Sequence, residues 1–514
     1  MEVTRINAPV KGWNTISPVR EMTQDFAVRL ENVWFDNAAA ANRRPGQLTA
    51  DNAAPSAGTI GSLHEHYSIS GISSIYAWCS DTNLYTISAG TWSAVAAMAA
   101  VFATKPRSAQ MGNVLLMGNG VAVRTYNGAA WATPAGVSPM SAFCVYNGRM
   151  YGTGNPADIG LVYYSNPITG TGATDWTVGG GGGFISAYGA LNEGENIVAL
   201  AEYQGYLVAF GSNSIIFYQG TDPNNPTTFR VAKTIKGIGC FSADSVQGIG
   251  NDLIFLSNYG FKSLKEVMVR GDAAAFETSF AINNYIAENI RTGNITNVSS
   301  TFAESFGVYL CTFGSETLAY HTLFNSWSSW NGVQPILFTT KAGLTYTANS
   351  RLHRISSTTY ADYLNGDSVG VPMSFVWETA PFRSGGQEIK SRWNRIELLY
   401  EGSIGDTVSV STWTDLNNSY ATSDILTLAP DLPPTAANSL LWTGTATTNP
   451  RNAWGTATTG PAWAGSSSGA SSGDESLPVV GRGELFSVRI ENTNKTPFKL
   501  IALETYYNQG NLRK

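Results

Sequence analysis

The sequence predicts an all-β protein built around a six- or seven-bladed β-propeller. Charged residues make up only 13% of the 514 residues and there are 53 glycines, a composition typical of turns and exposed strand faces rather than of surface helices. A short pattern, a tight turn followed by a compact apolar strand, also recurs along the middle of the chain. Its spacing is that of a propeller blade, so the repeat decides the architecture.

Seven copies of this pattern can be aligned: SDTNLYTIS, MGNVLLMGN, YNGRMYGTG, YQGYLVAFG, IGNDLIFLS, SFGVYLCTF and TKAGLTYTA. The alignment places one apolar residue of each copy at an equivalent position: Leu84, Leu115, Met150, Leu207, Leu253, Tyr309 and Leu344. The spacings range from 31 to 57 residues and average about 43, within the roughly 40 to 50 residues of a four-stranded blade. Some blades therefore carry long loops.

Three regions are expected. Residues 1–59 form an N-terminal arm with the strand that leads into the propeller, residues 60–368 form the propeller, and residues 369–514 form a β-sandwich-like domain in which strands become longer. Residues 416–478 are rich in Gly, Ser and Thr, too polar to bury much surface, and are expected to be a long loop or tip excursion. The alternation of Phe486, Val488 and Ile490, followed by a turn and by Phe498 and Leu500, predicts a terminal hairpin.

The overall charge limits the classes of function. A net charge of −6 and a pI near 5.4 argue against a module that binds nucleic acid by neutralising phosphates, because such binding needs clustered Lys and Arg. No run of apolar residues approaches the roughly 20 of a membrane-spanning helix. The first dozen residues also lack the apolar core of an export signal, so we expect the chain to remain in the cytoplasm after synthesis.

Four histidines and four cysteines are the first candidates for chemistry. His64 and His66 would share one face of a strand, as a metal pair requires, but no further ligand lies at a suggestive spacing, and a solvated loop pair ahead of the first blade is the preferred interpretation. His321 is expected in a blade strand rather than as a base. The four cysteines are far apart in apolar contexts and are predicted to be reduced core thiols: Cys79, Cys144, Cys240 and Cys311.

The acidic and glycine-rich motifs suggest no catalytic machinery. Glu193 with Glu195, and Asp474 with Glu475, are expected to be solvated in loops. Gly179 to Gly183 lack the Lys-Ser/Thr of a phosphate-binding loop and are expected to form a flexible connection between blades. We therefore predict that the protein is not an enzyme and has no catalytic, cofactor-binding or metal site.

Four passages together resemble the tail nozzle or hub proteins of short-tailed bacteriophages, sometimes called DNA-stabilisation proteins. The opening arm contains GWNTISPVREM, AVRLENVWF and RRPG, and the second passage is VYYSNPITGTGATDW, a Tyr-Ser-x-Pro blade edge running to a Trp. The third is IIFYQGTDPNNPTTFRVAKTIKGIGCFSADSVQGIGNDLIFLSNYGFKSL, and the fourth is GRGELFSVRIENTNKTPFKLIALETYY. The resemblance covers the arm, the propeller and the C-terminal domain, but not residues 416–478.

The resemblance implies a structural virion protein. Such a subunit assembles as a ring, usually a homohexamer, below the portal and adaptor proteins, and encloses the channel through which the double-stranded genome leaves. Tail fibre or spike proteins would be further partners, and the DNA would pass without tight binding. The arm would act as a strap, with these candidate assembly contacts: Trp13, Trp34, Phe35, Arg43, Arg44 and Pro45.

Three alternatives stay open. The arm can instead be the first strand of a blade. The protein can be a receptor-binding tail tip or fibre protein, although such proteins are more often trimers with β-helix repeats. A sialidase-like propeller glycosidase would gather acids and Tyr at the propeller axis, but the Ser-x-Asp-x-Gly-x-x-Trp box of sialidases is not repeated in the sequence; TGATDW at residues 171–176 is its nearest approach.

Overall fold

The structure, a computed structural model of residues 1–514, describes all of them except 1, 57, 169–173, 271–277, 294–296, 314–315, 384–389, 404, 416–421, 429–469 and 510–514. The chain folds into two compact units. The propeller unit comprises residues 46–357 and 362–371, and the sandwich unit comprises residues 1–45, 358–361 and 372–514. The chain passes between them at Pro45 and near β33 (Ala361–Asp362) and β34 (Val371–Pro372).

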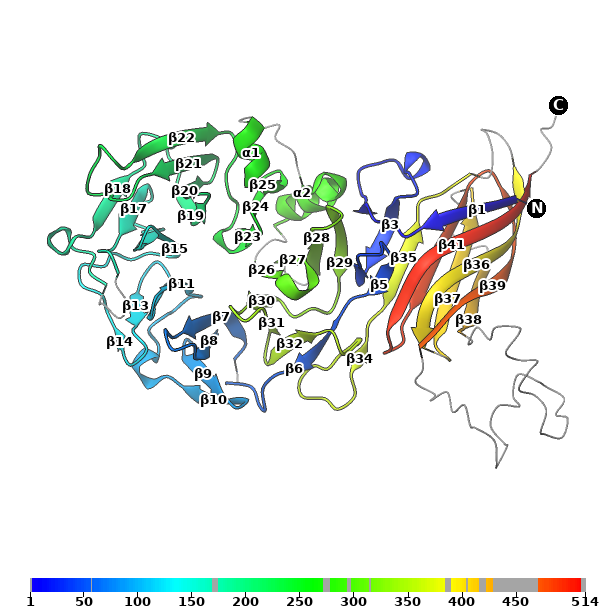
Figure 1. Ribbon diagram of the computed structural model, residues 1–514, viewed down its shortest axis with the longest axis horizontal. Helices are drawn as coiled ribbons and strands as arrows, with labels where there is room; N and C mark the ends of the chain where they lie inside the picture. The colour runs from blue at the N-terminus through cyan, green and yellow to red at the C-terminus, as the bar shows by residue number, and fades with distance from the viewer. Residues whose placement is uncertain are drawn as a thin grey trace. The chain divides into compact units, whose positions relative to one another are not determined.

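The propeller unit is a ring of β-sheets, each beginning with its innermost strand (Figure 1). Blade 1 consists of β7 (Ile60–Tyr67), β8 (Ser73–Cys79), β9 (Leu84–Ser88) and β10 (Thr91–Ala94), and blade 2 consists of β11 (Arg107–Met111), β12 (Val114–Gly118), β13 (Val123–Tyr126) and β14 (Trp131–Ala132). Blade 3 consists of β15 (Ala142–Tyr146), β16 (Arg149–Thr153), β17 (Leu161–Tyr164) and β18 (Gly183–Ser186). Blade 4 consists of β19 (Ile197–Tyr203), β20 (Tyr206–Gly211), β21 (Ser214–Gln219) and β22 (Arg230–Lys236).

Blades 5 to 7 complete the ring. Blade 5 consists of β23 (Gln247–Ile249), β24 (Asp252–Ser257) and β25 (Gly260–Ser263). Blade 6 consists of β26 (Val298–Ala303), β27 (Val308–Phe313), β28 (Glu316–His321) and β29 (Ser326–Trp330). Blade 7 consists of β30 (Ile336–Thr339), β31 (Thr345–Ala348), β32 (Leu352–Ser356) and β6 (Gly46–Thr49). Among the described residues there are thus six four-stranded blades and one three-stranded sheet. The predicted all-β propeller of six or seven blades is confirmed.

Blade 7 is closed by a strand from the opposite end of the unit. β6 pairs antiparallel with β32, with Thr49 opposite His353 and Gly46 opposite Ser356. Just after β6, the buried carboxylate of Asp51 lies 2.6 Å from Nε of Arg351 and accepts a hydrogen bond from Nε1 of Trp92 at 2.9 Å. Asp51 therefore ties blade 1 to blade 7, so that side-chain bonds add to strand pairing at the closure.

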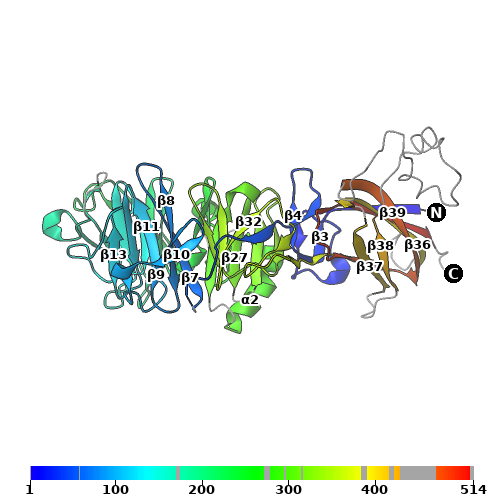
Figure 2. The same cartoon turned by 90° about the horizontal axis from the view of Figure 1, so that it is seen from below.

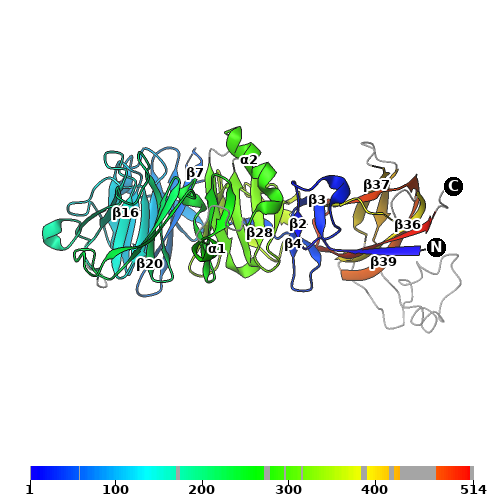
Figure 3. The ribbon, with the colours of Figure 1, turned by 90° about the horizontal axis from the view of Figure 1, so that it is seen from above.

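Helices accompany the three-stranded blade. β25 is followed by α1 (Leu264–Arg270) and then by η5 (Phe280–Ile282) and α2 (Asn283–Arg291). The backbone N–H of Phe261 in β25 donates to Oγ of Ser279 at 2.8 Å, and Ser279 in turn donates to Asn283 at 2.6 Å. Side chains of the helical segment therefore satisfy a polar group at the edge of β25. α2 projects from one face of the propeller (Figures 2 and 3).

The core lies between neighbouring blades, because each sheet packs on both faces. The second and third strands of blade 4 are buried along most of their length, as expected for strands buried on both faces. Phe210 in β20, for example, packs against Phe255 in β24 with ring centroids 5.0 Å apart. The four cysteines are all buried and free, as predicted, and burial raises the pKa of each thiol to about 12.

The sandwich unit consists of two sheets. One contains β39 (Ala470–Gly483), β36 (Ser391–Ser403), β41 (Phe498–Gln509), β5 (Ala41–Arg43) and β4 (Val33–Phe35), with β1 (Glu2–Asn7) also on β41. The other contains β3 (Phe26–Glu31), β35 (Phe375–Thr379), β40 (Phe486–Asn492), β37 (Thr407–Thr414) and β38 (Thr422–Thr427), with β2 (Gly12–Trp13) beside β3. η1 (Val19–Glu21) lies between β2 and β3. Figure 3 shows β37 on one side of this unit and β39 on the other.

Aromatic residues join the two sheets. Trp393 of β36 stacks on Phe486 of β40 with ring centroids 4.4 Å apart, and Phe375 of β35 meets Phe498 of β41 edge-on at 5.1 Å. All four side chains are buried. The predicted sandwich is therefore present, with its core between the inner faces of the sheets.

The predicted arm and hairpin differ from the structure. Residues 1–45 are not a separate arm, because β1 and β5 pair with β41 and β3 pairs with β35. The terminal hairpin is wrong, since β40 has β35 and β37 as its neighbours while β41 has β36. Local alternation indicated both strands correctly, but it does not say which partner each strand takes.

The predicted excursion at residues 416–478 is partly ordered. β38 lies within it, and β39 begins at Ala470 and pairs with β36 over most of that strand's length. Residues 416–421 and 429–469 lie outside the described residues. The predicted boundary near residue 369 falls within three residues of the change of unit at Val371 and Pro372.

The repeat alignment was right for six of its seven copies. Leu115, Met150, Leu207, Leu253 and Tyr309 lie near the start of the second strand of their blades, and Leu344 directly precedes the second strand of blade 7. Leu84 instead begins β9, the third strand of blade 1. The second and third strands of a blade are both short, apolar and preceded by turns, so the pattern cannot distinguish them.

Candidate functional site: the axial cavity

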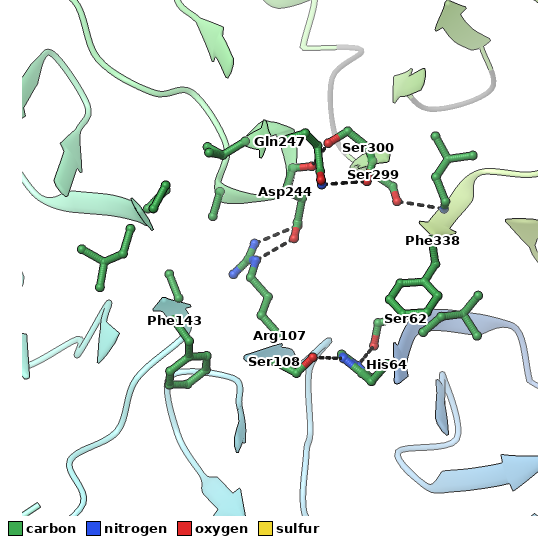
Figure 4. A pocket seen from close by; sticks show the side chains of 18 of the residues that line it. Ser62, His64, Arg107, Ser108, Phe143, Asp244, Gln247, Ser299, Ser300 and Phe338 are labelled. Carbon is green, nitrogen blue, oxygen red and sulfur yellow. Dashed lines mark hydrogen bonds and ion pairs between the residues drawn. The ribbon is translucent and has the colours of Figure 1, made fainter. Parts of the chain in front are cut away.

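The propeller unit encloses a cavity of about 360 Å³ where its innermost strands converge. Every blade contributes, with lining residues in β7, β11, β15, β19, β23, β26 and β30. Figure 4 shows Arg107 reaching from one side of this space towards Asp244 on the other. Its size is that of a small-molecule pocket.

Small and polar side chains dominate the lining because seven strands approach one another at the axis. β15 contributes Ala142, β19 contributes Ala199 and Ala201, and β26 contributes Ser299 and Ser300. Larger apolar side chains also line the cavity: Phe143, Phe338, Leu63, Leu200, Val246, Leu253, Ile336 and Leu337. Hydrogen bonds join neighbouring strands around the ring, as where Nε2 of Gln247 donates to the carbonyl of Ser300 at 3.1 Å.

An ion pair crosses the cavity. Arg107 begins the innermost strand of blade 2, and Asp244 lies in η4 (Ala243–Ser245), just before the innermost strand of blade 5. Nε of Arg107 lies 2.7 Å from Oδ1 of Asp244, and Nη2 lies 2.9 Å from Oδ2. Nζ of Lys105 lies 3.2 Å from the same Oδ2. Two cations thus share one carboxylate between blades that are not neighbours in the ring.

Asp244 is held as the ionised acceptor. Burial alone would raise the pKa of its carboxyl, but the charges of Lys105 and Arg107 and their hydrogen bonds outweigh burial and lower that pKa. The carbonyl of Asp244 accepts a hydrogen bond from Oγ of Ser300 at 2.6 Å. The side chain of Ser242 accepts from the N–H of Asp244 at 3.3 Å. The carboxylate is therefore fixed from both main chain and side chain.

His64 occupies the wall beside this pair. Its Nδ1 lies 2.8 Å from Oγ of Ser108, and its Nε2 lies 2.8 Å from Oγ of Ser62. Burial, and to a smaller degree the charge of Lys105, lowers the pKa of His64 to about 3. The imidazole is therefore neutral at physiological pH, and its bond to Ser108 of β11 links blade 1 to blade 2.

Asp244 and His64 are both engaged within the axis. A general base needs a free carboxylate or imidazole within reach of its substrate, but both oxygens of Asp244 are occupied and both nitrogens of His64 are bonded. Glu202, which also lines the cavity, is exposed. Across the described part of the chain, no three His, Cys, Asp or Glu side chains are placed to share a metal ion. Nor, in that part, is any helix long and apolar enough to span a bilayer.

No motif in the sequence points to this site. Arg107 and Asp244 are 137 residues apart, and neither belongs to a motif. The sequence predicted His64 and His66 to lie in a solvated loop, which is wrong, because both are buried in β7. Nε2 of His66 bonds the carbonyl of Asn113 at 3.0 Å. Residues 60–67 read IGSLHEHY, in which apolar and polar residues do not alternate, so the local pattern carried no signal for this strand.

The other predicted chemical residues have structural surroundings. His321 lies buried in β28, as predicted, with Nε2 2.8 Å from Oγ of Ser328. Glu195 was expected to be solvated but is buried, and it accepts a hydrogen bond from the N–H of Asn192 at 3.0 Å. Gly179 to Gly183 connect β17 to β18 inside blade 3 rather than joining two blades. There, Gly182 approaches the backbone of Trp176 too closely for a side chain.

The candidate assembly residues all lie in the sandwich unit. Phe35, Arg43, Arg44 and Pro45 are buried, and Trp13 and Trp34 are half-buried. Nη2 of Arg43 donates to the carbonyl of Asn492 at 2.9 Å, and Nε of Arg44 donates to Oδ1 of Asn32 at 2.9 Å. The two arginines therefore bind their own chain. Nε1 of Trp13 donates to the carbonyl of Val28 at 3.0 Å.

Comparison with known proteins shows similarity to solved structures alone, since no protein-family model and no curated protein matches the chain. The extracellular domain of BT4673 from B. thetaiotaomicron aligns at a TM-score of 0.40 and 10% identity, covering 63% of this chain and 42% of that one. Raptor from Chaetomium thermophilum aligns at 0.37 and 12%, covering 62% and 29%. The computationally designed Ika8 protein aligns at 0.33 and 8%, covering 60% and 99%. The chain thus spans less than half the length of the first two structures, and at these scores the alignments assign no function.

Proposed function

We propose that this protein is a tail nozzle or hub subunit of a short-tailed bacteriophage, a structural virion protein that retains the genome and lets it leave during ejection. The proposal rests on where the four resembling passages lie. The arm supplies β2 to β5, the second passage begins in β17 and continues into the connection that follows it, the third runs from β21 through β25, and the fourth contains β40 and β41. Three of the four passages therefore include whole framework strands from one unit or the other.

The geometry of the axis supports a non-catalytic role. Lys105, Arg107 and Asp244 are paired with one another at the axis, and the imidazole of His64 is neutral. A sialidase-like enzyme would gather acids and Tyr at the axis, whereas the described lining of the cavity holds two acids, Asp244 and the exposed Glu202, and no Tyr. Hydrolysis of a fluorogenic sialoside by the purified protein, lost in an Asp244→Asn variant, would favour the enzyme over the structural protein.

The size of the cavity supports a conduit formed between copies rather than through one propeller. A space of about 360 Å³ crossed by an ion pair does not admit a duplex. The conduit is therefore enclosed by several copies arranged in a ring, as in the resembling family, below the portal and adaptor. Tail fibres or spikes would be further neighbours in the virion.

The net charge of the chain limits how strongly the conduit can bind DNA. Six copies at −6 each carry −36, and a conduit that releases DNA quickly cannot hold phosphates with many Lys and Arg, since each neutralised phosphate adds affinity through counterion release. We expect a neutral to acidic lumen. Binding to duplex DNA at physiological salt should then be weaker than the 10⁻⁴ to 10⁻⁶ M typical of non-specific DNA-binding proteins.

Electron microscopy and mass measurement of the purified full-length chain test the proposal. The expected result is a ring with a central opening and, for a hexamer of 54.9 kDa chains, a mass of about 330 kDa. Reconstruction of the virion should place this ring between the adaptor and the tail tip. A chain that stays monomeric both alone and with the adaptor, or a trimer at a fibre tip, would contradict the nozzle and favour the receptor-binding alternative.

A further inference from the structure

Strand β1 is weakly anchored compared with the other N-terminal strands. It covers one edge of β41, pairing residue by residue from Glu2 opposite Tyr507 to Asn7 opposite Ala502. Of its six side chains only that of Ile6 is buried, and Val3 is 50% exposed. Its attachment is therefore made mainly by main-chain hydrogen bonds.

The strands that follow are fixed by their side chains. β3 buries Ala27 and Leu30, β4 buries Val33 and Phe35, and β5 buries Ala41 and Arg43. Two side-chain hydrogen bonds of β1 are part-buried: Oγ1 of Thr4 donates to Oη of Tyr507 at 3.5 Å, and Oγ1 of Thr505 donates to the carbonyl of Thr4 at 3.3 Å. At the surface, Arg5 lies 3.6 Å from the carboxylate of Glu504, and both side chains reach solvent. Exposed ion pairs of this kind contribute little. Separation of β1 from β41 therefore withdraws one core side chain, that of Ile6, and leaves the buried side chains of β3 to β5 in place.

The edge that β1 covers cannot stay bare. The opposite edge of β41 is occupied by β36, and β5 covers only Lys499 and Leu500 on the β1 side. Without β1, residues 502 to 507 would present unpaired N–H and C=O groups, a template for pairing with another chain. A strand of the same sequence from a second copy would make the same main-chain bonds, so exchange between copies carries little enthalpic cost.

The connection to β2 sets the reach of such an exchange. Ala8 to Lys11 join β1 to β2, and the N–H of Lys11 donates to the carbonyl of Asp25 at 3.0 Å. Straightening these four residues would move β1 by at most about 13 Å. Exchange thus requires a neighbouring copy packed closely against this edge, as in a ring.

We propose that β1 is an exchangeable strand, which covers β41 of its own chain in the monomer and β41 of a neighbouring copy in the assembly. The proposal rests on the ring assembly of the proposed function. It identifies the edge formed by Ala502 to Tyr507 as the surface that receives a second copy of this chain.

Two single-cysteine variants, Thr4→Cys and Thr505→Cys, test the exchange. These residues are register partners, and the Cα atoms of antiparallel partners lie about 4.5 to 5.5 Å apart, within the range that a disulfide bridges. The two variants are mixed as full-length proteins at high concentration, incubated to assemble and mildly oxidised. A disulfide between the two chains can form only if β1 of one copy lies on β41 of the other.

The controls separate exchange from chance contact. Replacing Thr4→Cys by Asn7→Cys moves the thiol three residues out of register, about 10 Å along the strand, and should abolish the cross-link. The parent chain, oxidised in the same way, shows whether its four buried cysteines form any disulfide of their own. The Thr4→Cys/Thr505→Cys double variant shows whether the strand closes within one chain.

The outcomes distinguish this proposal from the proposed function. Cross-linked pairs from the mixture support exchange, and they identify its site even if the assembly is not a ring. Rings whose double variant forms only internal disulfides, while the mixture gives none, overturn exchange and leave the nozzle intact. A chain that gives only internal disulfides at every concentration also overturns exchange.

Discussion

Arg107 and Asp244 meet in the axial cavity of the propeller, with Nε of the arginine 2.7 Å and Nη2 2.9 Å from the two carboxylate oxygens. They belong to blade 2 and to the segment before blade 5, so the pair braces the ring across its centre. Arg107 also donates to the carbonyl of Ser141 at 3.2 Å. The contact therefore joins three parts of the ring that strand pairing leaves separate.

Removing the acid should destabilise the propeller unit. Asp244→Ala leaves Arg107 and Lys105 in the cavity without their shared carboxylate, and we expect a loss of about 1 to 3 kcal/mol, because both cations keep partial access to solvent. Urea unfolding of the full chain measures this. Glu288→Ala is the matched control, since its pair with Arg291 is exposed, and it should change stability by less than about 0.5 kcal/mol.

A double-mutant cycle with Arg107→Ala tests whether the two residues act together. The two losses should be clearly non-additive, because removing the second partner relieves the unpaired charge left by the first. Additive losses would mean that the brace carries no coupling of its own.

Acid should destabilise the propeller well above the pKa of its carboxylates. Burial lowers the pKa of His64 and of His321 to about 3 from an ordinary value of 6.5, so below about pH 6.5 the unfolded chain binds protons that the folded chain does not. Stability then falls as pH drops from about 6.5 to 3, by about 1 kcal/mol per pH unit for each histidine. The lowered pKa of Asp244 extends the loss to lower pH.

The midpoint of urea unfolding, measured between pH 7 and pH 4.5, checks this dependence. The His64→Gln and His321→Gln variants should each start less stable and show a shallower slope. A slope unchanged in both variants would mean that the imidazoles do not bind fewer protons in the folded state.

Asp51 should matter more than any other single acid for closing the ring. Its carboxylate is buried and bonds Arg351, Trp92 and the N–H of Leu352. Asp51→Ala would leave a largely buried guanidinium without its charge partner, at a cost of about 3 to 5 kcal/mol. Hydrogen exchange should accelerate first in β6 and β32. If these strands were as well protected in the variant as in the parent chain, Asp51 would not be needed to close the ring.

Arg43 should behave as a core residue rather than as an assembly contact. Its guanidinium is buried among the carbonyls of Asn492, Asn494 and Thr496, and burial lowers its pKa to about 10, so it remains charged. Arg43→Ala should lower the stability of the sandwich unit by about 2 to 4 kcal/mol. Trp13→Ala, at a half-buried position, should affect assembly more than folding.

Comparing light scattering of assemblies with thermal melting separates the two effects. If Arg43→Ala lost assembly without any change in thermal melting, the arginine would be a contact between copies rather than a core residue.

The sequence by itself determined the class of fold and much of its local structure. Low charge, abundant glycine and a turn-plus-strand period were enough for a propeller followed by a sandwich, because strand alternation and turn chemistry act over a few residues. The same local signals placed Met150, Leu207 and Leu253 at equivalent positions of their blades and predicted that the cysteines lie in the core.

Only the tertiary structure decided which distant segments pair. Nothing near Gly46 indicates that β6 closes blade 7, nothing near Glu2 indicates β41 as its partner, and nothing near Arg107 or Asp244 indicates the other. These choices are made when sheets close into a ring or face one another, since a strand's pattern specifies a buried face but not the neighbour that buries it. Burial then converted His64, His66 and Arg43 from candidate surface residues into parts of the framework.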